Sequence, residues 1–137
     1  MDLNRFITVH EENFERAFAE IKNEKKTSHW MWYIFPQLEG LGTSLMAKKY
    51  AIKNLEHARL FLEHPILGAN LLKITNELLK AKTSNPNLIM GIIDDMKLKS
   101  SMTLFSKLNS DLKLFDEVIF KFYFGQYDDR TLELLQN

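Results

Sequence analysis

The chain has 137 residues, of which 45% are apolar and 26% are charged, a composition that excludes disorder and supports one folded domain with a substantial core. Eighteen acidic residues balance eighteen basic ones, so the chain lacks the net positive charge of proteins that grip nucleic-acid backbones. It contains no cysteine, which excludes disulfides, thiolate nucleophiles and cysteine-bound metals.

The compartment is inferred from the same composition. The polar N-terminus lacks the apolar core of a signal peptide, and no apolar run approaches the ~20 residues of a membrane span. Freedom from cysteine is typical of a reducing compartment. We therefore expect a cytoplasmic protein without membrane contact, folded as a single domain over residues 1–137.

The first predicted helix is marked by a capping box, since Thr8 and Glu11 have the required spacing. The apolar residues that follow on one helical face are Phe14, Phe18 and Ile21. A polar stretch, 22–26, then ends this helix.

An aromatic segment follows at 28–37, with the sequence Ser-His-Trp-Met-Trp-Tyr-Ile-Phe-Pro-Gln. Ser28 is placed to cap a helix that runs through this segment and stops before Pro36. The alternative is a buried strand, because aromatic residues favour sheets. We prefer the helix, since no other segment is a convincing partner strand.

Four further helix starts carry side chains that favour the N-cap position: Ser44, Asn54, Asn85 and Asp128. Pro86 follows one of these caps, and that helix is expected to end at Gly91. Pro65 suits the first turn of a longer helix. The buried stripe predicted for that longer helix is Leu67, Leu71, Ile74 and Leu78.

Two more helices complete the predicted fold. Asp94 is expected to begin one of them, and Gly125 is placed as the C-cap of the other. The stripe of the latter is Phe115, Val118, Ile119 and Phe122. Because no hairpin dipeptide separates alternating runs, the sequence predicts an all-α fold of about seven or eight short-to-medium helices.

Several motifs resemble bacterial family 1810 of the domains of unknown function. They are Arg5-Phe6, the whole segment 28–37, Gly40-Leu41-Gly42, Ser44, Tyr50-Ala51-Ile52, His64-Pro65, Leu67-Gly68, Asp94-Asp95, 97–105, Asp128 and Arg130-Thr131-Leu132. The resemblance implies a compact all-helical domain and no established activity. Two departures stand out, because the family pattern implies glutamine at His10 and arginine at Asn70. If that arginine holds an anion in relatives, anion binding is weaker or rearranged in this chain.

The turn 40–44 is a candidate anion site. A helix N-terminus presents unpaired N–H groups, which Gly42 and Ser44 would bring to a phosphate or carboxylate. The alternative is a tight connection in which Ser44 is an ordinary cap. A short Gly-x-Gly does not decide between them.

A second candidate face lies on the predicted helix around 97–103. Lys97, Ser100 and Ser101 are spaced to share a face that offers one cation and two hydroxyls. These groups suit phosphate oxygens or a ribose. In the alternative interpretation Ser100 and Thr103 donate their hydroxyls to the preceding turn, and the lysines are solvated.

The aromatic segment supplies the remaining candidates. His29 is the best candidate for acid–base chemistry, although it could instead donate its N–H to a carbonyl. Trp30, Trp32 and Tyr33 could stack a base or nicotinamide ring, and Gln37 is a further expected ligand-binding residue. A helix turns Trp32 away from Trp30, so both tryptophans cannot line one wall and at least one belongs to the core.

Two functions compete at this point. The first is a pocket for an anionic, nucleotide-like small molecule, with hydrolysis or group transfer as the simplest chemistry. The second is a non-enzymatic protein–protein interaction module that uses the tryptophan-rich segment. An exposed tryptophan patch would support this second function. The four histidines show no metal-ligand spacing and no motif names a cofactor. We expect a monomer or weak dimer, with nucleic-acid binding disfavoured.

Overall fold

The computed structural model describes residues 2–108 and 111–136. In this part of the chain the helices are α1 (Asn4–Lys22), α2 (Met31–Ile34), α3 (Leu45–Lys49), α4 (Leu55–Glu63), α5 (Leu67–Leu79), α6 (Pro86–Met90), α7 (Ile92–Ser106), α8 (Leu114–Tyr123) and α9 (Asp129–Leu135). The extended pairing between described residues is limited to one parallel bridge from Leu38 to Ile52. The prediction of an all-α fold is confirmed.

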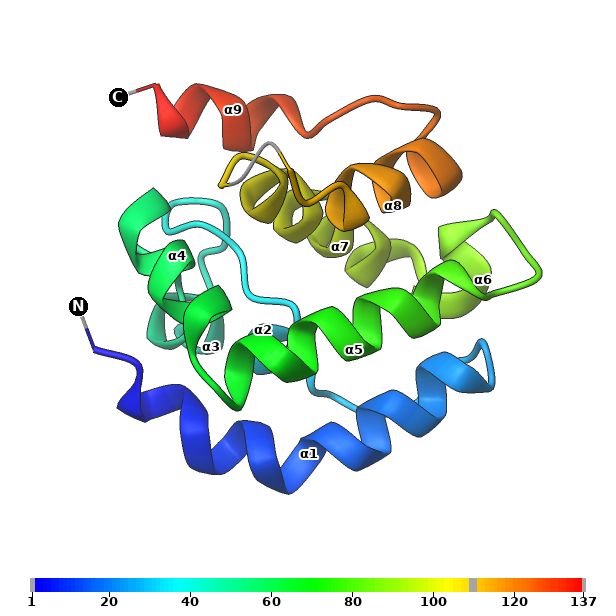
Figure 1. The fold of residues 1–137 in the computed structure, drawn as a ribbon, viewed down its shortest axis with the longest axis horizontal. Coiled ribbons are helices and arrows are strands. Elements are labelled where there is room, and N and C mark those ends of the chain that lie inside the picture. The colour runs from blue at the N-terminus through cyan, green and yellow to red at the C-terminus, as the bar shows by residue number, and fades with distance from the viewer. Residues whose placement is uncertain (1, 109–110, 137) are drawn as a thin grey trace.

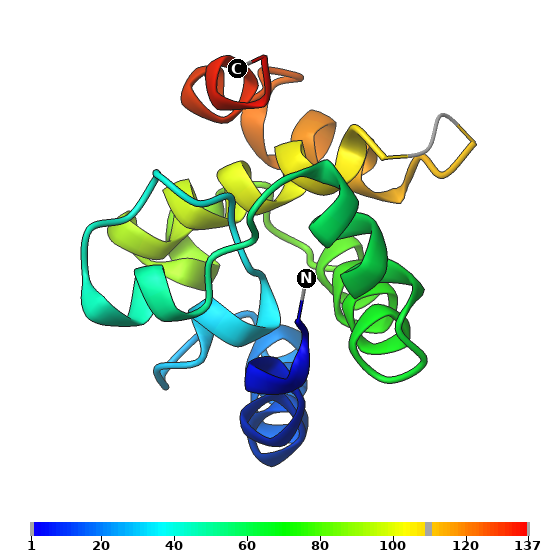
Figure 2. The same cartoon turned by 90° about the vertical axis from the view of Figure 1, so that its left-hand side faces the viewer.

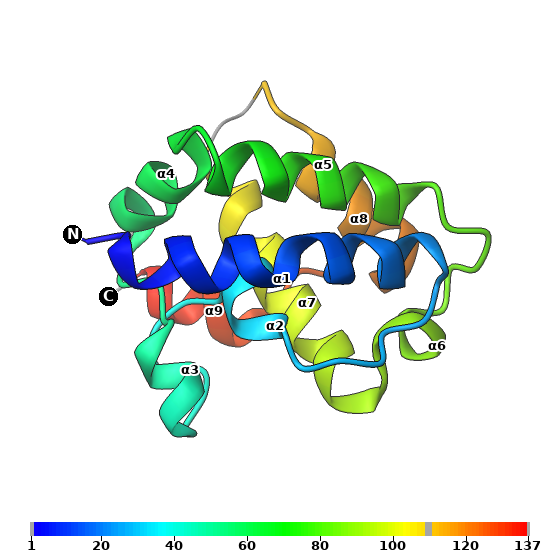
Figure 3. The ribbon, with the colours of Figure 1, turned by 90° about the horizontal axis from the view of Figure 1, so that it is seen from below.

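The longer helices frame the molecule. α1 and α5 run side by side along its length, as Figures 1 and 3 show, and α8 packs on α5 and on α7. Figure 2 shows α9 at the edge opposite α1, where it contacts α7. None of the described helices is long and apolar enough to cross a bilayer.

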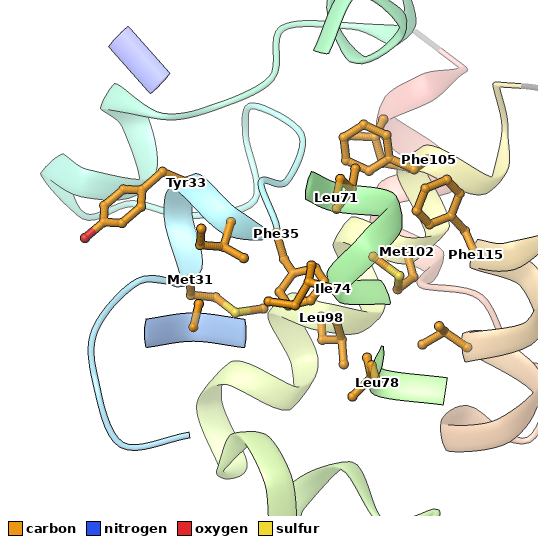
Figure 4. Packing of buried hydrophobic residues seen from close by; sticks show 14 of the residues in the cluster. Met31, Tyr33, Phe35, Leu71, Ile74, Leu78, Leu98, Met102, Phe105 and Phe115 are labelled. Carbon is orange, nitrogen blue, oxygen red and sulfur yellow. The ribbon is translucent and has the colours of Figure 1, made fainter. Parts of the chain in front are cut away.

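The core is built from the predicted stripes. The predicted α5 stripe is completely buried, and the α8 stripe is at most 3% exposed. Phe35 lies beside Ile74 of α5 and near Leu98 of α7, so the aromatic segment packs into the centre (Figure 4). A chain of ring contacts also joins α1, α4, α7 and α8 through Phe6, Phe61, Phe105 and Phe115.

Four of the predicted N-caps are confirmed, whereas those at Thr8 and Ser28 are not. Each side chain accepts a backbone N–H bond from the first turn of its helix: Ser44 from Ala47, Asn54 from His57, Asn85 from Asn87 and Asp128 from Thr131. Pro86 takes the first position of α6, and Gly91 ends that helix with a φ of 85°. These residues act within their own turn, which is why their spacing alone predicts them.

Four predicted helix boundaries are wrong. α1 begins at Asn4 rather than Thr8, because Asp2 accepts the Asn4 N–H at the start of the helix. α7 begins at Ile92, directly after Gly91, and not at Asp94. The start of α5 and the end of α8 also differ from the prediction, by one or two residues.

α5 begins after Pro65 rather than at it, and the ring Nδ1 of His64 accepts the N–H groups of Ile66 and Leu67. At the end of α8 the C-cap is Phe124 in the left-handed region, and Gly125 follows it with a positive φ.

The predicted helix through the aromatic segment is shorter than expected. α2 covers only Met31–Ile34, and Ser28 lies before it without capping it. The Ser28 hydroxyl instead donates to the Glu20 carboxylate of α1 at 2.6 Å. A tertiary hydrogen bond therefore replaces the predicted cap.

Gly68 sets the corner between α4 and α5. A Cβ at this position would lie 1.7 Å from the carbonyl oxygen of Leu62, so the two helices can approach this closely only at a glycine.

Candidate functional site

Glu20 organises the aromatic segment from α1. Its carboxylate accepts the backbone N–H groups of Thr27 and Ser28, the Ser28 hydroxyl, and the indole Nε1–H of Trp30 at 2.9 Å. Burial by itself raises the pKa of Glu20, but these hydrogen bonds, led by that of Ser28, outweigh burial and lower it to about 2. The carboxylate is therefore charged at neutral pH and holds Trp30 in the core.

Trp32 has different surroundings. The ammonium of Lys97, from α7, lies 5.5 Å from the centre of its ring. Its Nε1–H is buried, and no described residue accepts it. Trp32, Gln37 and Lys97 line a small cavity of about 10 Å³ together with Met31, Phe35, Ala47 and Tyr50. The aromatic segment thus presents Trp32, rather than Trp30, to an internal space.

A larger cleft of about 330 Å³ shares two of these lining residues, Gln37 and Lys97. Its other polar lining residues are Ser100 of α7 and, from the start of α9, Asp128 and Arg130. Its remaining lining is Leu41, Gly42, Ile93 and Met96. Residues from three distant parts of the sequence therefore meet in one cleft.

Gly42, which lines the cleft, packs closely on two residues that line the small cavity, Ala47 and Gln37. A Cβ at Gly42 would lie 2.4 Å from the Cβ of Ala47 and 3.2 Å from the Nε2 of Gln37. Any side chain there would displace both neighbours. Gln37 itself lines both the cleft and the small cavity, so its amide lies where the two spaces share their lining.

Charges of both signs surround the cleft. Lys97 pairs with Asp94 at 3.6 Å, and Asp94 is held more closely by Lys26, at 2.8 Å. Arg130 lies 3.4 Å from Glu133 and is 61% exposed. These pairs leave both cations of the cleft with donors that can reach a ligand.

The Asp128 carboxylate is already engaged. It accepts the backbone N–H and the hydroxyl of Thr131, and the backbone N–H of Asp128 donates to the hydroxyl of Thr103. Asp128 therefore fixes the start of α9 and, with it, the neighbouring Arg130.

The predicted α7 face is divided by the structure. Lys97 and Ser100 line the cleft, whereas Ser101 is completely buried and lies outside that lining. Ser100 donates to the carbonyl of Met96, and Thr103 donates to that of Lys99, as the alternative interpretation predicted. The Ser100 hydroxyl oxygen can still accept a bond from a ligand.

Four other predicted residues also lie outside the cleft lining. Trp30 is completely buried, and Ser44 serves as the cap of α3. Tyr33 is buried, which raises its pKa, and its hydroxyl donates to the carbonyl oxygen of His29 at 2.9 Å. The His29 side chain is exposed.

The two departures from the family pattern contact each other. The amide Nδ2 of Asn70 lies 3.1 Å from the Nε2 of His10, whose Nδ1 lies 2.9 Å from the carbonyl oxygen of Tyr33. Asn70 lines a groove between α1 and α5 that shares no lining residue with the cleft. The expected loss of an arginine therefore concerns another surface.

Sequence reasoning missed Asp128 and Arg130 as candidate site residues. Both lie in a motif that carries the family resemblance, so a signal was present. For Trp32 the helical period separated the two indoles but could not tell which one faces the core. Among the described residues, no group of three His, Asp or Glu side chains could hold a metal ion.

Comparison with known proteins agrees with this fold. The family model described as "Protein of unknown function (DUF1810)" matches residues 1–135. The chain is similar to the conserved hypothetical protein Rv1873 from Mycobacterium tuberculosis, a crystal structure with 38% sequence identity and a TM-score of 0.96, over 99% of this chain and 97% of that one. No curated protein matches the chain. The chain belongs to the DUF1810 family.

Proposed function

We propose that the cleft binds a small anionic, nucleotide-like molecule in the bacterial cytoplasm. One observation carries this proposal. Gln37 and Gly42 belong to one sequence segment and Lys97 and Ser100 to a distant one, and all four line the same cleft. A volume of about 330 Å³ is within the usual range for small-molecule sites.

The polar side chains that line the cleft suit a phosphate group. Lys97 supplies an ammonium and Arg130 a guanidinium fork, the two side chains that most often hold phosphate oxygens. The side chain of Lys97 is 28% exposed, so its charge is less screened than that of a fully solvated lysine. Gln37 adds an amide that can donate or accept.

The apolar side chains of the lining suit a flat ring. They are Leu41, Ile93 and Met96, of which Ile93 and Met96 are 72% and 67% exposed. A thioether packs well against aromatic rings. A base or nicotinamide ring covering these side chains would remove apolar surface from water.

The proposal is for binding, and hydrolysis or group transfer is not part of it. The carboxylate of the cleft, on Asp128, is engaged by Thr131, and the His29 side chain lies outside the cleft lining. We expect His29→Ala to bind ligands as the unaltered protein does. Reduced binding by this variant would extend the site toward the start of α2.

The first test is isothermal titration calorimetry against AMP, NAD, ADP-ribose, sugar phosphates and inorganic phosphate. We expect saturable binding of at least one nucleotide, weakened about tenfold or more by Lys97→Gln, since a charge-assisted hydrogen bond is lost. Lys99→Gln is the matched control, because Lys99 is on the same helix and outside the cleft lining.

The proposal fails if none of these compounds binds, or if the Lys97 and Lys99 variants bind equally well. Arg130→Gln separates the contribution of α9 from that of α7. We expect it to weaken phosphate-bearing ligands and to leave adenosine unaffected, because its guanidinium would contact only the anion.

The interaction module is the second candidate, and a different observation favours it. Leu88, Ile92, Ile93 and Met96 are all at least 60% exposed near the junction of α6 and α7. Exposed apolar groups of this kind mark many protein contacts. The tryptophan-rich segment cannot supply this surface, because Trp30 is buried.

Ile92 separates the two candidates, since it is 76% exposed and lies outside the cleft lining. For a contact surface on this side, Ile92→Ser would abolish capture of a partner protein, or a weak dimer detected by sedimentation, while ligand binding persists. If neither is observed with the unaltered protein, this second candidate is discarded.

A further inference from the structure

We propose that the small cavity behind the cleft is a subsite for one oxygen atom of the ligand's phosphate group, held by the indole N–H of Trp32. This inference rests on the proposed function, because the rest of the ligand would occupy the cleft. It assigns Trp32 a role in specificity.

The hydrogen-bonding state of Trp32 is the first reason. Its Nε1–H is buried, and no described residue accepts it. Buried donors are nearly always paired, because an unpaired one costs about 1–3 kcal/mol. The Nε1–H of Trp30, two residues away, meets this rule by donating to Glu20. An acceptor supplied from outside the protein would satisfy Trp32 in the same way.

The size of the cavity is the second reason. About 10 Å³ is close to the smallest space that accepts one water molecule or one ligand oxygen. A whole phosphate or a ring would not fit there, whereas the adjoining cleft has about 330 Å³. One oxygen of a ligand would therefore occupy the small cavity, and the rest of the ligand would occupy the cleft.

The charge and donors around the cavity are the third reason. Lys97 and Gln37 line both the small cavity and the cleft. A phosphate oxygen in the small cavity would therefore have an ammonium and an amide beside it. Lys97 also lies over the Trp32 ring, so a negatively charged oxygen would meet the cation and the indole N–H together. A phosphate oxygen suits this set better than a neutral hydroxyl.

The experiment follows the two indole N–H signals by ¹H–¹⁵N correlation NMR of the unaltered protein during titration with AMP. Trp32→Phe assigns the signals. We expect the Trp32 indole proton to move downfield as it gains an anionic acceptor, while the Trp30 indole proton, already bonded to Glu20, stays in place. Adenosine, which lacks the phosphate, should leave both signals unmoved.

Three results are distinguishable. A shift of the Trp32 signal with AMP and not with adenosine supports the subsite. Shifts of the backbone amides of Gly42 and Ser100 without a shift of the Trp32 indole overturn the subsite and leave the proposed function intact. If no signal moves with AMP or with inorganic phosphate, both the subsite and the proposed anion site are overturned.

Affinity gives a second readout that does not depend on the assignment. Trp32→Phe keeps an aromatic ring under Lys97, removes the N–H and leaves a smaller ring, so adenosine serves as the control for the change in shape. We expect AMP to bind about tenfold more weakly while adenosine binding is unchanged. Equal losses for AMP and adenosine would overturn the subsite, because they would indicate a change in the shape of the cleft.

Discussion

Trp30 and Trp32 lie two residues apart and have similar cationic neighbours, but their indole N–H groups differ. Lys26 lies 4.8 Å from the centre of the Trp30 ring, and Lys97 lies 5.5 Å from that of Trp32. Asp94 pairs with both lysines. The Trp30 N–H has an acceptor within the protein, whereas no described residue accepts that of Trp32.

This difference separates a structural environment from one that is open to a ligand. Around Trp30 the indole N–H and the Ser28 hydroxyl donate to the Glu20 carboxylate, and the Lys26 ammonium donates to the Ser28 carbonyl. Around Trp32 the same kinds of groups leave a donor unmatched beside a cavity. Aromatic density alone does not identify a site; an unmatched donor next to a space is the more informative signal.

Among these tests, removal of the Glu20 side chain should cause the largest loss of stability. In Glu20→Ala the donors of Thr27, Ser28 and Trp30 lose their acceptor, so we expect the free energy of unfolding to fall by about 4 kcal/mol. Urea denaturation measures it. Glu15→Ala, an exposed site on the same helix, is the control and should change little. A loss under about 1 kcal/mol in the Glu20 variant would show that the network is not stabilising.

Acid should weaken the Trp30 environment through the same carboxylate. The folded-state pKa of Glu20 is about 2, below its ordinary value of 4.5, so its contribution is complete above pH 4.5 and is lost as the pH falls toward 2. The linked loss is up to about 3 kcal/mol. Urea denaturation at several pH values between 6 and 2 should show this loss in the free energy of unfolding in the unaltered protein. The part due to Glu20 should be missing in Glu20→Ala.

Asp94 connects the two environments, so its removal should affect both. Lys26 is only 6% exposed, and Asp94→Asn takes away its nearest charge partner, which we expect to cost about 2 kcal/mol. The same change frees Lys97 and should strengthen anion binding at the cleft. Thermal unfolding and calorimetry measure the two effects, and an unchanged stability would separate Lys26 from this network.

The smallest effect on stability is expected at Trp32 itself. Trp32→Phe removes an unpaired donor, which stabilises the fold, and shrinks a partly buried ring, which destabilises it, so we expect a net change of less than about 1 kcal/mol in the free energy of unfolding. Trp30→Phe breaks the bond to Glu20 and should cost about 2 kcal/mol. Equal losses in the two variants would remove the distinction between the two environments.

The fold was largely predictable from local chemistry. Ser44, Asn54, Asn85 and Asp128 cap helices within their own first turn, and the α5 and α8 stripes follow the helical period. The errors arise where another part of the chain intervenes. Ser28 bonds to Glu20 eight residues earlier, so a residue with good cap chemistry is used elsewhere. Propensity cannot foresee such a tertiary partner.

The candidate site was predictable only in part. Lys97 and Ser100 could be placed on one helical face, and the turn containing Gly42 was a recognisable feature. Their meeting in one cleft depends on how distant elements pack, as does the arrival of Arg130 from α9. Burial of Ser101 beside them shows that a shared helical face can still be divided between solvent and core.

The Leu38–Ile52 bridge closes the loop that contains the turn at 40–44, so this loop can change in length without a change in the helices. Backbone bonds from Ile52 N–H to the Gln37 carbonyl and from Glu39 N–H to the Ile52 carbonyl tie the two ends of this loop at its base. The entropy of closing a loop rises only slowly with its length, so residues can be gained or lost at its tip at little cost in stability. Leu41 and Gly42 line the cleft, so a change in loop length between relatives would alter the shape of the cleft while the helical frame is kept.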